Sequence, residues 1–436
     1  MNRPIQATHS IALLPFAVFV GLFLTSAIFF NSALSPLFTC LLAITVSFFT
    51  FKENLSINRK VEIGIEGSAQ PTVLAMCYIF IFSAVFSYTL KLIGGLDAAV
   101  NLGLYIIPNN FILPGFFIIV SLFATAIGTS MGAIAAFVPI GMGIAHQLGV
   151  DPALMAGVVV SGAMLGDNLS IISDTTIAAT QTTGARMKDK FRINLRLVAP
   201  AFFLTIITLF IINQYSSPDS TLLTLTTLNL NDIITTLPYM LIFLFALLGL
   251  DVIAVLIIGT SVAVAIGIWQ GTFDITRGTG IILEGFVKDS SGIQEVLILS
   301  LLVAALSHIV AYNGGIEYLL THMRKRIHTK GGAELYISIL VFLVNAAVAI
   351  NTIAILVTGP VAKKIGDSFD IAKSRVASLI DIVACVCQGI LPYAPQLLLA
   401  GSLAGVSSIA IIPHLHYQGY ILLVVIGSIV QTYIKN

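Results

Sequence analysis

The feature that most constrains this chain is a series of apolar runs, each about 20 residues long, that recur from one end to the other. A helix of that length crosses the hydrocarbon core of a bilayer and satisfies its own backbone hydrogen bonds there. Charged residues make up 9% of the chain, whereas soluble domains carry about a quarter. We therefore expect an all-α integral membrane protein without a soluble module.

Short sequence motifs of the first half recur in the second half. Four short matches follow each other in the same order at offsets of 223, 218, 220 and 221 residues, close to half of the 436-residue chain. Ordered self-similarity at a nearly fixed period indicates an internal repeat. We expect residues 1–213 to form one repeat, 214–233 a linker and 234–436 a second repeat. The matches are Leu14-Pro15-Phe16 with Leu237-Pro238-Tyr239, Glu66-Gly67 with Glu284-Gly285, Gly94-Gly95-Leu96-Asp97 with Gly314-Gly315-Ile316-Glu317, and Pro139 with Pro360.

Each repeat is expected to hold about five membrane-spanning helices, one of them interrupted, and one re-entrant hairpin. The segments 111–148 and 336–365 are broken at Gly128-Thr129-Ser130 and at Asn351-Thr352. Each half of these segments is about 13–18 residues long, which is short of a full span, so we expect hairpins with polar tips. The spans are expected near 10–31, 33–51, 72–93, 153–183 (interrupted), 193–213, 235–250, 252–270, 293–313, 374–405 (interrupted) and 417–434.

The positions of Lys and Arg predict the topology, because basic residues favour the cytoplasmic side. With a cytoplasmic N-terminus, the loops at 94–110, 149–152, 214–233 and 406–416 lie outside and carry no Lys or Arg. Corresponding loops of the two repeats then fall on opposite sides, which predicts inverted repeats and a cytoplasmic C-terminus. The outer loop at 271–292 has Arg277 and Lys288, outnumbered by acidic residues. The inner basic residues are Lys52, Arg59, Lys60, Arg186, Lys188, Lys190, Arg192, Arg324, Lys325, Arg326, Lys330, Lys363, Lys364, Lys373, Arg375 and Lys435.

Two carboxylates interrupt the fourth span, within Gly166-Asp167-Asn168-Leu169-Ser170-Ile171-Ile172-Ser173-Asp174-Thr175-Thr176. An ionised group at membrane depth is costly and usually faces a wet cavity lined by protein, where it has a function. Neutral oxygens beside such carboxylates suit a hard cation. Asp174 also fits a helix-capping role, which stays open beside a ligand role. The candidate cation- and proton-binding residues here are Asp167, Asn168, Ser173, Asp174 and Thr175.

The second half contributes fewer charged candidates. Asp381 is a lone carboxylate at expected membrane depth on the interrupted helix 374–405, and we expect it to join the cation- and proton-binding set. The break at 388–396 offers amides, prolines and a phenol without a charge. The hairpin tips add Thr129, Ser130, Asn351 and Thr352, either as ligands or as small packing residues. The loop residue Lys190 and its basic neighbours are assigned to topology alone.

The segment from Ser161 to Thr180, followed by Met187-Lys-Asp-Lys-Phe-Arg-Ile-Asn194, resembles the NhaC-type sodium/proton antiporter family of the ion transporter superfamily. The resemblance implies a cation/proton exchanger of a prokaryotic inner membrane. It maps the family's core motif onto Gly166, Asp167, Asn168, Ser173, Asp174 and Thr175. Relatives in this group include carriers of organic acids or amino acids, so the resemblance leaves the substrate open.

Sodium/proton antiport by alternating access is the expected function, since inverted repeats with interrupted helices are typical of such carriers. Sodium- or proton-coupled transport of an amino acid or small carboxylate is the alternative. An enzyme is not expected, because no His-Glu-x-x-His motif or facing Ser/His pair occurs. We expect no cofactor, no structural metal and no nucleic-acid partner. The expected partners are a small cation, protons and the lipid bilayer; an organic solute and a second copy of the chain stay open.

Overall fold

A computed structural model gives the fold of the chain. It describes residues 10–29, 35–51, 53–95, 98–99, 102, 108–171, 173–216, 230–248, 250–277, 280–281, 284, 293–316, 318 and 329–435. Within these residues every regular element is a helix, which confirms the all-α prediction. Most of the expected linker and the basic cluster at 324–326 lie outside the described residues.

Nearly every expected span corresponds to a helix whose ends lie within a few residues of the prediction. The largest difference is at α10, which begins six residues early at Met187 because its first turns pack inside the protein around Lys190. The helices of the first half are α1 (Leu14–Phe29), α2 (Pro36–Ser47), α4 (Pro71–Leu92), α6 (Ile112–Ile127), α7 (Ser130–Leu148), α8 (Pro152–Leu169), α9 (Asp174–Thr183) and α10 (Met187–Ser216). Those of the second half are α11 (Leu230–Leu247), α12 (Val252–Trp269), α14 (Ile293–Tyr312), α16 (Lys330–Val348), α17 (Asn351–Ser368), α18 (Lys373–Ile390), α19 (Pro395–Ala404) and α21 (His416–Lys435).

One amphipathic helix was not predicted. The segment that we assigned to a loop contains α3 (Ile57–Ser68), whose N-cap Ser56 accepts a hydrogen bond from the Arg59 amide. Gly64 and Gly67 let α3 lie directly against α14, and Ser68 donates a hydrogen bond of 2.8 Å to the Leu301 carbonyl. A short turn of helix, α20 (Ser408–Ile411), follows α19.

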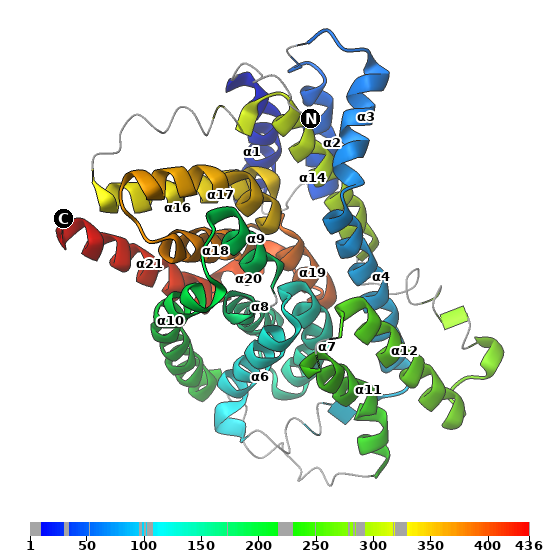
Figure 1. The fold of residues 1–436 in the computed structure, drawn as a ribbon. Coiled ribbons are helices and arrows are strands. Elements are labelled where there is room, and N and C mark those ends of the chain that lie inside the picture. Colours follow the sequence, from blue (N-terminus) through cyan, green and yellow to red (C-terminus); the bar gives the residue numbers. More distant parts are fainter. Residues whose placement is uncertain are drawn as a thin grey trace.

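The helices form two groups that Figure 1 shows side by side. A side bundle contains α1 to α4, α11, α12 and α14, and runs from the top of the view to its lower right. A core bundle contains α6 to α10 and α16 to α21. The two groups meet where α4 contacts α7, where α11 contacts α6, and where α14 contacts α19. Each half of the sequence therefore contributes helices to both bundles.

The interrupted helices occupy the centre of the core bundle. Helices α8 and α18 each have 18 residues, and α9 and α19 each have 10. The first and last residues of α18 and α19 lie 221 positions after those of α8 and α9; for example, Lys373 begins α18 and Pro152 begins α8. In the most apolar stretch of each interrupted helix, 88% and 89% of the stretch is buried inside the protein, whereas the corresponding share in α10 and α21 is 28%. The breaks are extended at Ser170 and Ser173 in one half and at Leu391 and Ala394 in the other.

The expected hairpins are helix pairs joined by short turns. A left-handed residue ends the first helix of each pair, Gly128 with φ 77° and Ala349 with φ 55°. The length argument for re-entrance is wrong for α7 and α16, because each has 19 residues and is long enough to cross a membrane. Helix α16 begins at Lys330, earlier than expected, because Thr329 caps it through the Gly332 amide. Re-entrance of the two pairs stays a prediction.

The outward surface of the helices is apolar. Along α10 and α21, large apolar side chains such as Phe203, Ile207, Leu423 and Ile426 are exposed. In the described part of the chain, eight helices or interrupted helices are long and apolar enough to cross a membrane. The chain is a multi-pass membrane protein. These helices are Val73–Leu92, Ser130–Leu148, Pro152–Thr183, Met187–Tyr215, Val252–Trp269, Lys330–Val348, Lys373–Ala404 and His416–Ile434.

Candidate functional site

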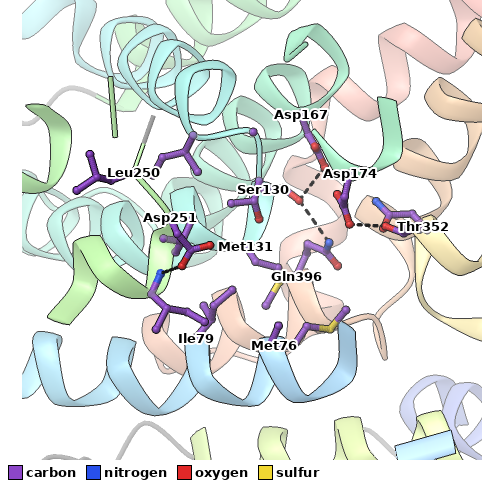
Figure 2. A pocket seen from close by; sticks show the side chains of 17 residues that line it. Met76, Ile79, Ser130, Met131, Asp167, Asp174, Leu250, Asp251, Thr352 and Gln396 are labelled. Carbon is purple, nitrogen blue, oxygen red and sulfur yellow. Dashed lines mark hydrogen bonds between the residues drawn. The ribbon is translucent and has the colours of Figure 1, made fainter. Parts of the chain in front are cut away.

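A cavity of about 440 Å³ lies between the two bundles where several helix ends meet (Figure 2). The starts of α7, α9, α17 and α19 reach it from the core bundle, and the starts of α4 and α12 reach it from the side bundle. The residues that line it are Ala75, Met76, Ile79, Ile127, Gly128, Thr129, Ser130, Met131, Asp167, Asp174, Leu250, Asp251, Val252, Ile253, Asn351, Thr352 and Gln396. Both predicted hairpin tips and two of the three predicted carboxylates are therefore brought together.

Asp167 lies in the last turn of α8, with a side chain that is 2% exposed. Its Oδ2 accepts a hydrogen bond of 3.1 Å from Ser130 Oγ, and its Oδ1 accepts one of 2.5 Å from Ser173 Oγ. The last turn of α8 lies close to α6 because residue 166 is glycine: a Cβ there would lie 2.6 Å from the Ser121 carbonyl oxygen. This packing holds Asp167 at the wall of the cavity.

Asp174 is the first residue of α9 and is exposed toward the cavity. Its Oδ2 accepts a hydrogen bond of 2.5 Å from Thr352 Oγ1, and its Oδ1 accepts one of 3.0 Å from the Thr175 amide. Ser173 holds the N-cap position, but no capping bond from its side chain is present. Asp174 thus lies at a helix start, a position that favours a negative charge, and its Oδ2 faces the second half of the chain.

The hairpin tips supply hydroxyl and amide groups. Ser130 and Thr352 donate to the two carboxylates, and the Asn351 Oδ1 accepts from the Thr352 amide at 2.9 Å. Thr129 precedes α7 and lines the cavity without a capping bond. Helix α7 begins at Ser130 and α17 at Asn351, so these two positions of the tips correspond.

Three predicted residues lie behind the cavity wall. Ser173 and Thr175 are buried, and their hydroxyl oxygens lie 2.9 Å apart. Asn168 is buried on the far side of α8 and donates a hydrogen bond of 2.9 Å to Tyr417 Oη. None of the three is among the lining residues. Ser173 still reaches the site indirectly, because it holds Asp167.

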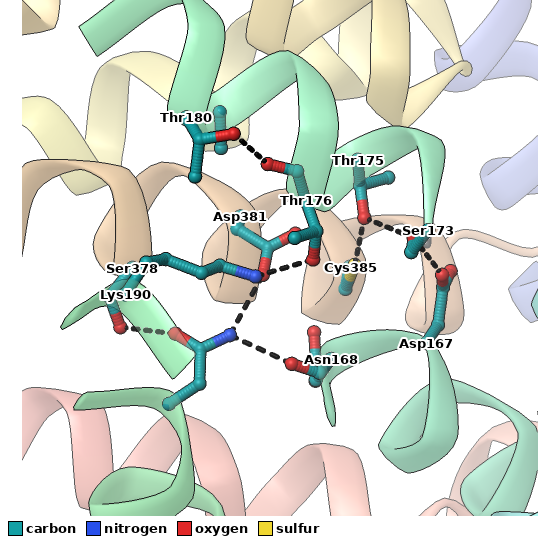
Figure 3. Close-up of polar contacts among 12 residues, drawn as sticks. Asp167, Asn168, Ser173, Thr175, Thr176, Thr180, Lys190, Ser378, Asp381 and Cys385 are labelled. Carbon is teal, nitrogen blue, oxygen red and sulfur yellow. Dashed lines mark hydrogen bonds and ion pairs between the residues drawn. The ribbon is translucent and has the colours of Figure 1, made fainter. Parts of the chain in front are cut away.

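Asp381 has a different environment from the other two carboxylates. It is fully buried in α18, and its Oδ2 forms an ion pair of 2.6 Å with Lys190 Nζ (Figure 3). Asn194 Nδ2 also donates to this oxygen at 2.9 Å, and Lys190 contacts Thr176 Oγ1 at 2.5 Å. Asp381 does not line the cavity, and its charge is neutralised within the protein.

The sequence interpretation missed the role of Lys190. It is 1% exposed, whereas its neighbours Arg186 and Lys188 are exposed as loop residues would be. Lys190 and Asn194 are four residues apart, which places them on one face of α10. That spacing alone does not indicate burial, because the ion-pair partner Asp381 lies 191 positions later in the sequence.

The second break carries amides, as predicted. Gln388 occupies the place in α18 that Asp167 has in α8, 221 residues earlier. Its Nε2 donates to Gln396 Oε1 at 2.9 Å, and Gln396 Nε2 lies 3.4 Å from Ser130 Oγ. The amide pair thus continues the polar network of the first half without adding a charge.

The polar groups of the cavity suit a small cation better than a resident metal. Within the described residues, no group of three His, Cys, Asp or Glu side chains could hold a metal ion. The lining residues include carboxylates, hydroxyls and amides but no Lys, Arg or His. Hydroxyl, amide and carboxylate oxygens are the ligands of hard cations such as Na+.

Sequence comparisons agree with this chemistry. The sequence model of the Na+/H+ antiporter family matches residues 4–215 and again residues 212–433. The Na+/H+ antiporter NhaC of Alkalihalophilus pseudofirmus is 26% identical over 316 residues, which is 68% of each chain. NhaC of Bacillus subtilis is 24% identical over 390 residues, 82% of this chain and 83% of the relative. The malate-2H+/Na+-lactate antiporter of Bacillus subtilis is 21% identical over 345 residues, 73% of each chain.

The two matches of the family model together cover nearly all of the chain, one in each half. They confirm the resemblance that was based on the segment around Asp167 and Asp174. They also agree with a site made of carboxylate and hydroxyl oxygens between membrane helices. The chain belongs to the Na+/H+ antiporter family.

Proposed function

We propose that this chain exchanges Na+ for H+ across a membrane, and that both ions use Asp167 and Asp174. The observation that carries the assignment is the contrast among the three carboxylates that the sequence predicted for the site, Asp167, Asp174 and Asp381. Asp381 is neutralised by Lys190, whereas no basic side chain of the described residues lies within ion-pair distance of Asp167 or Asp174. Two carboxylates without a counter-ion at one cavity are available to bind a cation or a proton.

Competition for these carboxylates couples the two ions. A carboxylate held away from water is less costly when it is neutralised, and either a proton or Na+ can neutralise it, so the two ions compete for it. Thr352 places a hydroxyl oxygen beside Asp174, and Ser130 places one beside Asp167. Asn351 adds an amide oxygen to the lining of the same cavity. Na+ that binds there displaces protons, and protons that bind there displace Na+.

Movement between the two membrane faces requires the cavity to open alternately to each side. Support comes from two features: the interrupted helices α8 and α18 have equal lengths, and the family model matches each half once. We propose that the two halves are inverted repeats, and that the side bundle and the core bundle, each built from both halves, rock against each other about the site. An empty site with two unpaired charges resists this movement, which disfavours leak of either ion.

Transport of an amino acid or small carboxylate is the second candidate. A specific observation favours it: α7, α9, α17 and α19 all begin at the cavity, and helix starts attract carboxylates. The malate-2H+/Na+-lactate antiporter is also a relative. Against it, the lining residues include no basic side chain for an anion. Asp167 and Asp174 already provide negative charges for these helix starts.

Solid-supported-membrane electrophysiology on proteoliposomes distinguishes the two candidates. A Na+ jump alone should give a transient current or a proton flux if the chain is a Na+/H+ antiporter. A current that depends on added lactate, malate or an amino acid would instead assign the organic solute. Liposomes that contain the Asp167→Asn protein serve as the control for both measurements.

We also propose a location and an assembly. The chain lies in a prokaryotic inner membrane with both termini in the cytoplasm, supported by the basic residues of the predicted inner loops. Exchange by Asp167 and Asp174 needs no cofactor. Assembly as a homodimer stays a prediction.

A further inference from the structure

A third carboxylate lines the cavity from the opposite bundle. Asp251 precedes α12, is exposed, and lies across the cavity from Asp174 and Thr352 (Figure 2). Its Oδ1 accepts a hydrogen bond of 2.8 Å from the Ile253 amide, which makes it the N-cap of α12. The mechanism proposed above does not use this residue.

Capping accounts for an oxygen acceptor at position 251 but not for its negative charge. Asp151 caps α8 in the same manner, with its Oδ1 2.9 Å from the Ala153 amide, and it does not line the cavity. Asn and Ser cap a helix about as well as Asp does. A cap therefore does not require a negative charge, and the charge of Asp251 faces a cavity that already holds two carboxylates.

We propose that Asp251 is a cation-capture residue, which concentrates Na+ in the cavity before the ion reaches Asp174 and Asp167. A carboxylate on the wall of a concave site with apolar surroundings raises the local concentration of cations. Its companions on that wall are Leu250, Val252 and Ile253, which carry no charge of their own. This inference rests on the proposed cation exchange.

The position of Asp251 also makes its effect depend on the side of the membrane from which Na+ arrives. Asp251 belongs to the side bundle, whereas Asp167 and Asp174 belong to the core bundle. Alternating access changes how the bundles face each other, so Asp251 borders the site in the arrangement seen here. The predicted topology places the loop between α11 and α12 on the cytoplasmic side. Capture by Asp251 therefore acts on Na+ that arrives from the cytoplasm.

The test compares Asp251→Asn with the matched cap variant Asp151→Asn in everted and right-side-out vesicles. We expect Asp251→Asn to raise the apparent Km for Na+ about threefold or more at low ionic strength in everted vesicles, whose outer face is the cytoplasmic one, and not in right-side-out vesicles. Choline chloride at about 1 M should remove the difference, because the Debye length falls to about 3 Å. The maximal rate should stay within about twofold of wild type, and Asp151→Asn should match wild type throughout.

Several outcomes would overturn the inference. They are an unchanged Km in everted vesicles, a rise in Km that also occurs in right-side-out vesicles, an equal change in Asp151→Asn, or a rise in Km that persists at high ionic strength. A lower maximal rate at unchanged Km would also reject capture. If the wild-type protein itself shows no Na+-driven proton movement, the proposed function fails, and that result is separate from any difference between the variants.

Discussion

Thr352 at the start of α17 donates a hydrogen bond of 2.5 Å from Oγ1 to Asp174 Oδ2 at the start of α9. The bond joins residues that are 178 positions apart, one from each half of the chain. Helix α17 also packs along α9 over its length. The break in the first half is thus held by the tip of the helix pair from the second half.

Replacement of Asp167 by Asn tests the centre of the proposal. Asn keeps an oxygen of nearly the same position but cannot take or release a proton. We expect Asp167→Asn to abolish Na+-driven proton movement, measured by fluorescence dequenching in everted vesicles, while the thermal stability is unchanged or higher. Asp174→Asn should act in the same way. Full exchange activity in the Asp167→Asn protein would contradict the assignment of the site.

The hydroxyl of Thr352 has a separate test. Thr352→Val keeps the shape of the side chain and removes the donor to Asp174, so the apparent Km for Na+ should rise about three- to tenfold. Thr352→Ser, which restores a hydroxyl, should return most of the affinity. Thr358→Val is the matched control on the same helix, because Thr358 bonds only to the Ala354 carbonyl. An equal effect of both valine variants would assign Thr352 to packing.

The Lys190–Asp381 pair predicts a strong effect on stability. Lys190→Met leaves the Asp381 carboxylate buried without a counter-ion, which costs roughly 3–5 kcal/mol. The melting temperature of the purified protein in detergent should therefore fall by several degrees. The double variant Lys190→Met/Asp381→Leu should recover most of the lost melting temperature, since no unpaired charge stays buried. Lys188→Met, on the exposed face of α10, is the control and should melt like wild type.

Cysteine labelling tests the topology. The four natural cysteines are buried, so they give little background. Cysteines placed at the exposed positions 188 and 364 should react with a membrane-impermeant maleimide only from the cytoplasm. A cysteine at the exposed position 407 should react only from outside. Labelling of 188 and 364 from opposite faces would reject the expected arrangement of the helix pairs.

Much of the fold could be predicted because the membrane restricts the choice of structure to helices of known length. The spans and both breaks follow from apolar runs that polar residues or prolines interrupt. The start of α16 could not be found in this way, since Gly331 and Gly332 look like a loop until Thr329 caps them. Helix α3 was missed because its sequence is mostly polar, and its position depends on the glycines that face α14.

The site was predicted in part. Asp167, Asp174 and the hairpin tips could be proposed because a charge or a polar turn inside an apolar segment needs an explanation. Their convergence at one cavity depends on contacts between segments far apart in the sequence. The same limit explains why the burial of Lys190 was not predicted, since its sequence neighbours are those of a surface loop residue. Its burial follows from the pairing with Asp381, 191 positions later, and no local pattern contains that information.

The presence of Gln388 at the place that corresponds to Asp167 limits the stoichiometry of exchange. A symmetric pair of carboxylate sites would let each half carry its own ion. Here the second half offers an amide, which cannot accept a proton at physiological pH. Asp167 and Asp174 can therefore carry at most two protons in one cycle. Exchange of two protons for one Na+ would move net charge and respond to the membrane potential, whereas one proton for one Na+ would not.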